Sequence, residues 1–242
     1  MKYKAFIFDL FGTLVDNFST EEHKNMLVKM SAILEIGHTE FISEWLDSFE
    51  MRMLGKLKGP KENIEYICVK IGKKVSEGRI KKAAKIRSDF EKNALKPRKN
   101  CIKTLNKLIE LNYQLGLISD CSYEVVRSWK NTAFSKIFDK PIFSCEIGIK
   151  KPDIRIYQIT CKNLNVKPNE CIYVGDGSSN ELSGAANAGM KPIRIQVPYE
   201  MNNSTYKIDE DRIECRVIKS LDELLYLEEI IDLLKIKKKL IY

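Results

Sequence analysis

The sequence lacks several features that would assign the chain to a specialised class of protein. Its seven cysteines are odd in number and include no C-x-x-C pair, which argues against a disulfide framework and a zinc site. No apolar run is long enough to span a bilayer. The N-terminus leads directly into a predicted strand, so we expect no signal peptide. These absences predict a cytoplasmic protein with reduced thiols and no membrane partner.

The net charge is basic, but the basic residues are spread along the chain. Lys and Arg number 41 against 33 Asp and Glu, which gives a net charge of +8 and a pI near 9.0. A basic field favours anionic ligands, whereas a nucleic-acid footprint should cluster on one element. We therefore predict a small anionic substrate and no nucleic-acid partner. Nothing in the sequence specifies an oligomeric state.

Residues 18–91 have the pattern of a helical block. Apolar residues recur at helical spacing in four stretches, which polar joints separate at 37–38, 55–60 and 72–78. A short apolar run at residues 3–8 precedes the block and has the length of a strand. We therefore expect four helices inserted after the first strand, as a cap over the carboxyl edge of a sheet.

From residue 100 onward, predicted strands and helices alternate, which is typical of a mostly parallel sheet with helices on both faces. The predicted fold class is α/β: a doubly wound, Rossmann-like core with an inserted all-helical cap. We place the core in residues 1–16 and 96–242 and the cap in residues 17–95. The predicted strands are 114–118, 142–143, 171–174, 192–196 and 217–218, and the predicted helices are 100–111, 122–129, 154–164, 181–188 and 221–234.

Four short polar stretches fall at or near the ends of predicted strands. They are DLFGT at Asp9, LISDC at Ser119, KKPD at Lys151 and VGDGSSNE at Asp176. Each stretch alone also fits a structural role as a turn, a helix cap or a surface loop. Because ligands of open α/β sheets bind at the carboxyl edge, the four together predict one site there.

The residue types in these stretches suit chemistry on an anionic group. A carboxylate such as Asp9 can form a mixed anhydride with phosphorus or an ester with carbon, which splits one displacement into two. Lys151 offers a fixed cation and Ser119 a hydroxyl donor to phosphoryl oxygens. Backbone N–H groups at Gly12 and Thr13 can cradle the same anion. Two acidic side chains and a carbonyl make a hard oxygen site suited to Mg²⁺.

On these four motifs the sequence resembles the haloacid dehalogenase superfamily of hydrolases, with a helical cap inserted after the first motif. The resemblance implies that Asp9 is the catalytic nucleophile, that Ser119 and Lys151 assist it, and that a covalent aspartyl intermediate is hydrolysed. It also implies a Mg²⁺ cofactor. The implied metal ligands are Asp9, the carbonyl of Phe11, Asp176 and, directly or from the outer shell, Glu181. The implied substrate- and phosphate-binding residues are Phe11, Gly12, Thr13, Ser119, Asp120 and Lys151.

Phe11 departs from the phosphatases of this family, in which a second aspartate at this position protonates the leaving alcohol and later activates water. General acid–base catalysis is typically worth ~10²- to 10⁴-fold, so three interpretations stay open. The chain is a phosphatase that is slow or prefers leaving groups needing little protonation, such as acyl phosphates. It is a dehalogenase, a branch in which an aromatic residue commonly stands here and to which Tyr157 is also similar. Or it binds an anion without turnover.

The fourth motif favours the phosphatase interpretation. Dehalogenases of the family need no metal and usually carry a small polar residue in place of Asp176. Without a cation, Asp176 and Glu181 would repel Asp9 and raise its pKa. Because this charge has to be balanced, whereas a missing acid is tolerated with a good leaving group, we favour a Mg²⁺-dependent phosphatase acting on a small organic phosphate.

The remaining polar and aromatic residues are first given structural roles. We expect Asp120 to cap the next helix, rather than act as a stand-in acid, and Cys121 to be a small buried hydrophobe. Asp16 is expected at a hinge or cap. In the cap we expect a solvated face at Arg52, Lys56 and Lys58, core positions at Phe41, Trp45 and Phe49, and structural or exposed roles for His23 and His38. The basic run 235–239 is expected to end a solvated helix.

Overall fold

A computed structural model describes residues 2–201, 210–228 and 230 of the chain. Its centre is a six-stranded sheet in the order β3-β2-β1-β4-β5-β6, and every strand pair is parallel. The predicted α/β doubly wound core is therefore confirmed. The strands are β1 (Ala5–Phe8), β2 (Gln114–Ser119), β3 (Ile142–Phe143), β4 (Cys171–Gly175), β5 (Lys191–Ile195) and β6 (Arg216–Ile218).

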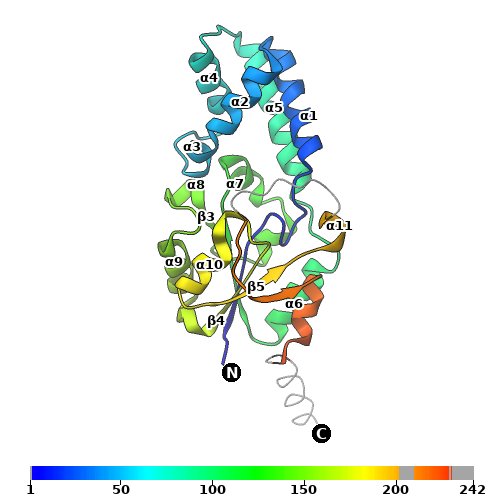
Figure 1. Cartoon of the computed structure of the whole chain (residues 1–242), viewed down its shortest axis with the longest axis vertical. Coiled ribbons are helices and arrows are strands. Elements are labelled where there is room, and N and C mark those ends of the chain that lie inside the picture. The colour runs from blue at the N-terminus through cyan, green and yellow to red at the C-terminus, as the bar shows by residue number, and fades with distance from the viewer. Residues whose placement is uncertain (1, 202–209, 229, 231–242) are drawn as a thin grey trace.

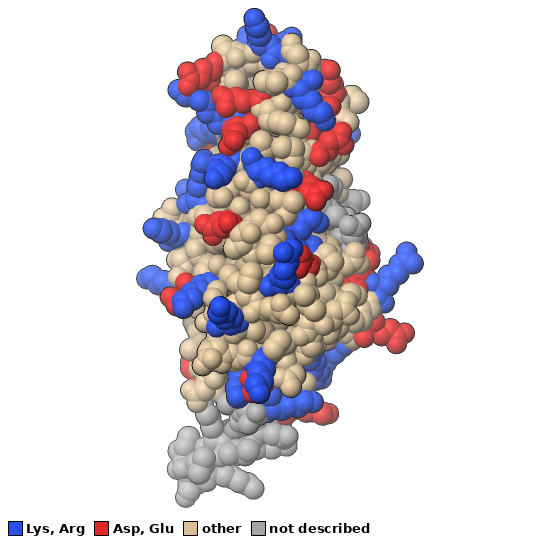
Figure 2. Space-filling model, turned by 90° about the vertical axis from the view of Figure 1, so that its left-hand side faces the viewer, with Lys and Arg blue, Asp and Glu red and all other residues tan. Residues whose placement is uncertain are grey.

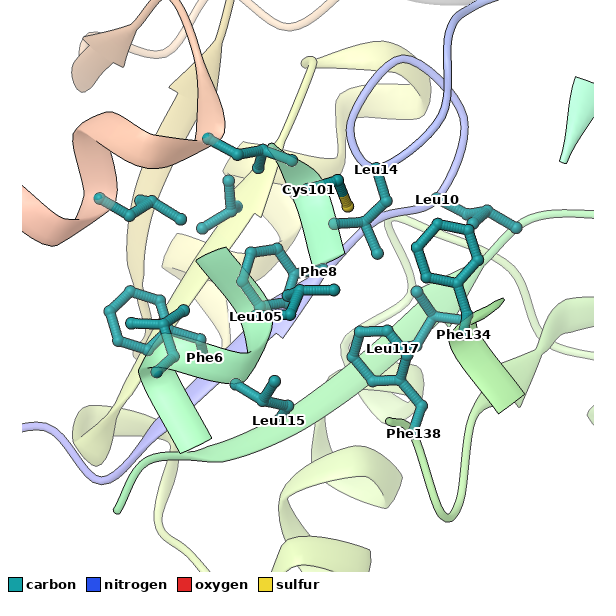
Figure 3. Close-up of a cluster of buried hydrophobic side chains, with 14 of the residues drawn as sticks. Phe6, Phe8, Leu10, Leu14, Cys101, Leu105, Leu115, Leu117, Phe134 and Phe138 are labelled. Atoms are coloured by element: carbon teal, nitrogen blue, oxygen red, sulfur yellow. The ribbon is translucent and has the colours of Figure 1, made fainter. Parts of the chain in front are cut away.

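The strand β1 is buried on both faces, as a central parallel strand requires. Successive side chains of a strand point to opposite faces. Phe6 and Phe8 accordingly join one hydrophobic cluster, while Ala5 and Ile7 join another on the reverse face. Figure 3 shows Phe6 and Phe8 beside Leu105 and Leu117 in the first cluster. Four consecutive apolar residues in the sequence therefore fill both layers of the core.

Helices cover both faces of the sheet (Figure 1). Apolar side chains of α6, α7 and the 3₁₀ helix η4 pack into the first cluster, and those of α9 and α10 pack into the second. The bounds are α6 (Cys101–Glu110), α7 (Tyr123–Trp129), α8 (Ser144–Ile147), α9 (Ile154–Leu164), α10 (Glu181–Asn187), α11 (Pro198–Met201), η1 (Ala133–Lys136), η2 (Pro168–Glu170), η3 (Ser178–Asn180) and η4 (Leu221–Tyr226).

The block inserted after β1 contains five helices among the described residues, not the four that the periodicity predicts. The predicted second helix is interrupted at Ser48, whose hydroxyl donates to the carbonyl of Trp45 (2.9 Å) and accepts from Arg52 (2.5 Å). These side-chain bonds compete with the helical ladder at that turn. The helices are α1 (Thr20–Leu34), α2 (His38–Asp47), α3 (Phe49–Met53), α4 (Pro60–Ile71) and α5 (Glu77–Ala94).

We propose these five helices as the cap domain, with the boundaries expected at residues 16/17 and 95/96. They share a hydrophobic cluster of their own that includes Phe41 and Trp45, as predicted, whereas Phe49, predicted with them, is half-buried and lies outside this cluster. In Figure 1 they extend beyond the carboxyl edge of the sheet, and α3 reaches down to α8. At that contact the hydroxyl of Ser144 donates to the carbonyl of Met53 (2.7 Å). The cap therefore touches the core directly above the edge where the polar motifs end.

Towards the C-terminus the prediction of a helix over 221–234 is wrong at its start. Residues Leu221–Tyr226 form the 3₁₀ helix η4, and the rest of the predicted helix lies largely outside the described residues, as does the basic run 235–239. Within the described residues, no helix has the length and apolar character needed to cross a membrane. The face seen in Figure 2 carries basic and acidic side chains interspersed along the whole molecule.

Candidate active site

Asp9 lies at the carboxyl end of β1, in the middle of the sheet. Its backbone N–H donates to the carbonyl of Val174 (2.9 Å), which continues the pairing of β1 with β4 by one residue. Asp176 follows β4, and Ser119 ends β2 on the other side of β1. The chain order changes direction across β1, so this edge is the topological switch point of the sheet. The predicted convergence of these motif residues at one edge is what the structure shows.

Lys151 joins two of the acids. Its ammonium nitrogen lies 2.5 Å from Asp9 Oδ1 and 2.5 Å from Glu181 Oε2, and all three side chains are buried. Burial lowers the pKa of the Lys151 ammonium, but the charges of Asp9, Glu181 and Asp120 outweigh burial and hold it well above its usual range. Lys151 is therefore a permanent cation beside the candidate nucleophile.

Glu181 is held by four hydrogen-bond donors, of which Lys151 is one. Oε2 also accepts from the hydroxyl of Tyr173 (2.8 Å), and Oε1 accepts from the N–H of Gly177 (3.0 Å). The hydroxyl of Tyr157 donates to the backbone carbonyl of Glu181 (2.8 Å). A Cβ on Gly175 would lie 2.2 Å from Glu181 Oε1, so this carboxylate requires glycine at the end of β4.

Asp176 is positioned by the loop that it begins. Its Oδ1 accepts from the N–H of Ser178 (2.9 Å), and its Oδ2 accepts from the side-chain amide of Asn17 (3.1 Å). Gly12 has a φ of +77°, and a Cβ there would lie 2.5 Å from Asp176 Oδ2. The glycine of the first motif therefore lets the backbone after Asp9 approach the carboxylate of the fourth motif.

Oxygen atoms of Asp9, Asp176 and Glu181 all lie within 4.8 Å of one another. Burial raises the pKa of Asp9 to about 6, against the lowering effect of Lys151, and Asp176 raises it further. Burial and the charge of Asp9 raise the pKa of Glu181 to about 8. Three crowded, buried carboxylates form a donor set that fits a hard divalent cation. Glu181 is fully buried (0% exposed), whereas Asp9 and Asp176 keep 5% and 2% exposure, so Asp9 and Asp176 have the more accessible ligand atoms.

Two hydroxyl groups of the predicted phosphate-binding set are buried at the same edge. Within the described part of the chain, neither Ser119 Oγ nor Thr13 Oγ1 has a hydrogen-bond partner. A buried hydroxyl without a partner carries a desolvation cost unless a ligand satisfies it. Both hydroxyls can therefore donate to a ligand that binds at this edge of the sheet.

Phe11 does not reach into the acid cluster but lines a cavity of about 80 Å³ between cap and core. Its ring packs on Phe18 (5.0 Å between centroids), which in turn stacks on Phe90 of α5 (5.2 Å). The cavity wall combines apolar rings with ionisable groups. It is lined by Phe11, Phe18, His23, Trp45, Leu46, Phe49, Arg52, Met53, Arg87, Glu91, Asp120, Cys121 and Ser122.

The cap contributes charged residues that the sequence analysis missed. Arg87 pairs with Glu91 on its own helix (2.7 Å) and with Glu124 on α7 of the core (3.3 Å), and all three are buried. In α5 the buried positions are Ile80, Ala83, Arg87 and Glu91. Arg87 and Glu91 continue the apolar face of Ile80 and Ala83 at helical spacing. This pattern was the available signal in the sequence, because charged residues on a buried helix face need partners across an interface.

Several structural expectations for single residues need correction. Asp120 does not cap α7: that helix begins after Ser122, and Asp120 Oδ1 accepts instead from the N–H of Lys151 (3.0 Å). Arg52 is not on a solvated face but is buried, with its guanidinium 4.4 Å from the ring centroid of Trp45. Asp16 does not cap α1, since Ser19 does, and it accepts from the hydroxyl of Tyr199 (2.5 Å).

Other expectations hold. Cys121 is buried, and all seven cysteines are free thiols. Lys56, Lys58 and His38 are exposed. His23, however, lines the cavity, and burial together with the charges of Arg87 and Arg52 lowers its pKa to about 4.

Comparison with known proteins gives one family match and several relatives. A family model described as haloacid dehalogenase-like hydrolase matches residues 6–195. A glyceraldehyde 3-phosphate phosphatase of Methanopyrus kandleri is 29% identical over 199 residues, which cover 80% of this chain and 84% of that protein. The (S)-2-haloacid dehalogenase 4A of Burkholderia cepacia is 34% identical over 96 residues, 38% of this chain and 40% of that protein.

Solved structures agree on the fold. A family enzyme from Bacteroides thetaiotaomicron, crystallised in complex with magnesium and inorganic phosphate, superposes with a TM-score of 0.60 at 21% identity. The superposition covers 80% of this chain and 94% of that one.

Proposed function

The chain belongs to the haloacid dehalogenase-like hydrolases, and we propose that it is a Mg²⁺-dependent phosphatase that acts on a small organic phosphate through an aspartyl-phosphate on Asp9. The proposal assigns catalytic roles to Asp9, Ser119 and Lys151. It assigns the metal to Asp9, Asp176 and the carbonyl of Phe11, with Glu181 in support.

One observation carries the proposal: three carboxylates share a buried site with one lysine, Lys151. Asp9, Asp176 and Glu181 with Lys151 sum to a charge of −2 when all four groups are ionised. Such a charge is costly in a buried site unless a cation balances it. A bound divalent cation removes the deficit and allows an anionic phosphate to approach an anionic nucleophile.

The residues of the chain then have separate tasks. Asp9 attacks phosphorus, and Lys151 stabilises the charge that develops on the phosphoryl oxygens. Ser119 and Thr13 donate their unpartnered hydroxyls to the same oxygens, together with backbone N–H groups of the Gly12–Thr13 turn. Mg²⁺, when bound, supplies Lewis-acid charge that orients the phosphate. Glu181 keeps Lys151 in place.

Size and relatives support a small substrate. A cavity of about 80 Å³ beside Phe11 would hold a short organic group next to the phosphate. The relative from Methanopyrus kandleri is named as a glyceraldehyde 3-phosphate phosphatase, and glyceraldehyde 3-phosphate is a substrate of that size class. We further propose that the chain works in the cytoplasm on soluble metabolites, with no nucleic-acid partner.

A second candidate is hydrolysis of a carbon–halogen bond without metal. Phe11 in place of an acid, the buried Tyr157, and the partial match to a haloacid dehalogenase favour it. Asp176 beside Asp9 and Glu181 weighs against it, because a metal-free site gains nothing from a third carboxylate.

The test is phosphate release from acyl, sugar and aryl phosphates, with and without Mg²⁺. We expect release that requires Mg²⁺ and disappears in Asp9→Asn, which keeps the shape of the side chain but not its nucleophilicity. Asp9→Asn also controls for contaminating phosphatases. Release of halide from 2-haloacids in a chelator, with no phosphate release, would establish the second candidate instead.

A further inference from the structure

The site needs a proton donor that Phe11 cannot provide, and the cavity that Phe11 lines contains another carboxyl group. We propose that Asp120 is the general acid–base residue of the reaction. In this role it protonates the leaving oxygen and then accepts a proton from the hydrolytic water. The inference rests on the proposed phosphatase function and adds to it a proton donor directly after Ser119.

Asp120 is placed by the core rather than by the cap. It follows Ser119 directly at the end of β2, so it lies one residue beyond a candidate phosphate ligand. It lines the same cavity as Phe11. The leaving group of a phosphoester must occupy space adjoining the phosphate site, and this cavity is the one that both residues border. Asp120 therefore has access to the region where the leaving oxygen would lie.

The two oxygens of Asp120 differ in their surroundings. Oδ1 accepts from the backbone N–H of Lys151 (3.0 Å), which fixes the orientation of the carboxyl group. Oδ2 is buried and, as far as the described residues extend, has no hydrogen-bond partner. A buried carboxyl oxygen without a partner is costly unless it carries a proton or meets a ligand. Oδ2 is thus the atom that can hold and transfer a proton.

Charged groups face Asp120 from several elements. The segment before α9 provides Lys151 and Lys150, and the cap wall of the cavity provides His23, Arg52, Arg87 and Glu91. Burial raises the pKa of Asp120, and the two lysines offset part of that rise. A carboxyl group with a raised pKa holds a proton closer to neutral pH, as an acid catalyst requires.

Glu91 and His23 also border the cavity and are weaker candidates for this role. Glu91 Oε2 lies 2.7 Å from a nitrogen of Arg87, so its charge is already paired within the cap. His23 has a pKa of about 4 and is therefore uncharged at neutral pH, without a proton of acidic strength to give. Asp120 is the carboxyl group in this wall that belongs to the core, one residue beyond the candidate phosphate ligand Ser119.

The proposed steps balance. In the first, an Asp9 oxygen bonds to phosphorus, the bond from phosphorus to the ester oxygen breaks, and the Asp120 proton moves to that oxygen. In the second, water bonds to phosphorus and gives one proton to the Asp120 carboxylate, while the bond between Asp9 and phosphorus breaks. Phosphate and alcohol leave, and both acids return to their starting states.

The experiment uses Asp120→Asn and a series of phosphates with leaving groups of graded basicity. Asparagine keeps the shape of the side chain and can still accept from the N–H of Lys151, so the change removes the proton alone. We expect kcat/KM for alkyl phosphates and phenyl phosphate to fall by about 10²-fold or more, and that for acetyl phosphate by less than about fivefold. Acetate leaves without protonation, whereas an alkoxide does not.

Two matched variants make the outcome decisive. Glu91→Gln removes the other carboxyl group of the cavity and should change good and poor leaving groups alike. Phe11→Asp in the Asp120→Asn background should restore part of the rate on alkyl phosphates. Equal losses for all leaving groups in Asp120→Asn, or a selective loss in Glu91→Gln, overturn the assignment while leaving the phosphatase function intact. Absence of turnover by the unaltered chain on every phosphate overturns the proposed function and this inference together.

Discussion

At the scale of single residues, the acid cluster determines how stability should respond to pH. Asp9 and Glu181 have pKa values raised from 3.8 to about 6 and from 4.5 to about 8. The folded state therefore binds these protons more tightly than the unfolded chain does. Their contribution to the free energy of unfolding is fully present below the unfolded pKa values of 3.8 and 4.5, and it is lost as the pH rises through about 6 and about 8. The metal-free protein thus carries its greatest electrostatic cost at neutral to basic pH.

Mg²⁺ should recover this loss, and the size of the effect should depend on pH. We expect the rise in Tm on adding Mg²⁺ to be larger at pH 8 than at pH 5.5, because the cation binds the deprotonated carboxylates. Scanning calorimetry with and without the ion measures it. The quantity to compare is the difference in Tm with and without Mg²⁺ at each pH, because Tm itself also depends on His23. The pKa of His23 is lowered from 6.5 to about 4, so protonation of the unfolded chain reduces stability as the pH drops below 6.5. Asp176→Asn is the control and should abolish the shift. Equal shifts at both pH values would argue against a metal among these acids.

The sequence predicts which residues of the four motifs lie at the site, but it does not predict the hydrogen bonds that they make. The sequence places Asp9, Ser119 and Asp176 beside predicted strand ends, and the sheet brings them to one edge. Nothing in the sequence indicates that Asp120 accepts from the backbone of Lys151 instead of capping α7. Capping is the local role open to any aspartate before a helix. The choice depends on a segment about 30 residues further along the chain, which only the fold brings close.

At the scale of elements, the loop after α3 docks the cap on the core through a glycine. Gly55 has a φ of +69°, and a Cβ there would lie 1.8 Å from the carbonyl oxygen of Cys145 in α8. Gly72, at the end of α4, has a similar φ of +74° but no described heavy atom within 4 Å of a Cβ. The two glycines therefore share a backbone conformation and differ in their surroundings.

We expect Gly72→Ala to cost about 1 kcal/mol of unfolding free energy, the ordinary penalty for alanine in the left-handed region. Gly55→Ala should cost about 1–3 kcal/mol more, because α3 has to move away from α8. It should also lower kcat/KM, since α3 carries Arg52 on the cavity wall. Urea unfolding and steady-state kinetics on both variants measure the effects. Equal losses in the two variants would show that α3 does not dock through this contact.

Element positions followed from periodicity wherever local pattern and tertiary packing agree. The predicted 142–143 strand and 154–164 helix coincide with β3 and α9. The break between α2 and α3 was missed because it depends on the side chain of Ser48 and the buried Arg52, which apolar spacing does not register. The short helices α8 and α11 were missed for a related reason. A single turn has too few residues to show a period.

At the scale of the whole molecule, cap and core meet through buried charge as well as apolar surface. Arg87 of α5 pairs with Glu124 of α7, and Glu91 lies beside both. The sequence predicts each helix separately but not which faces oppose each other, so this cluster was out of its reach. Removing one partner of a buried ion pair leaves the others charged and without compensation.

Arg87→Met should therefore reduce the free energy of unfolding by about 3–5 kcal/mol and expose the junction of α5 and α7 to amide hydrogen exchange. Arg79→Met is the matched control on the same helix. It removes an exposed, solvent-screened pair with Glu35 and should lower the free energy of unfolding far less. Adding Glu124→Gln to Arg87→Met should restore part of the loss, because the remaining carboxylate charge disappears. Equal losses of unfolding free energy in Arg87→Met and Arg79→Met would show that the buried pair does not join cap to core. The same conclusion would follow if Glu124→Gln destabilised the Arg87→Met variant as much as it destabilises the unaltered chain.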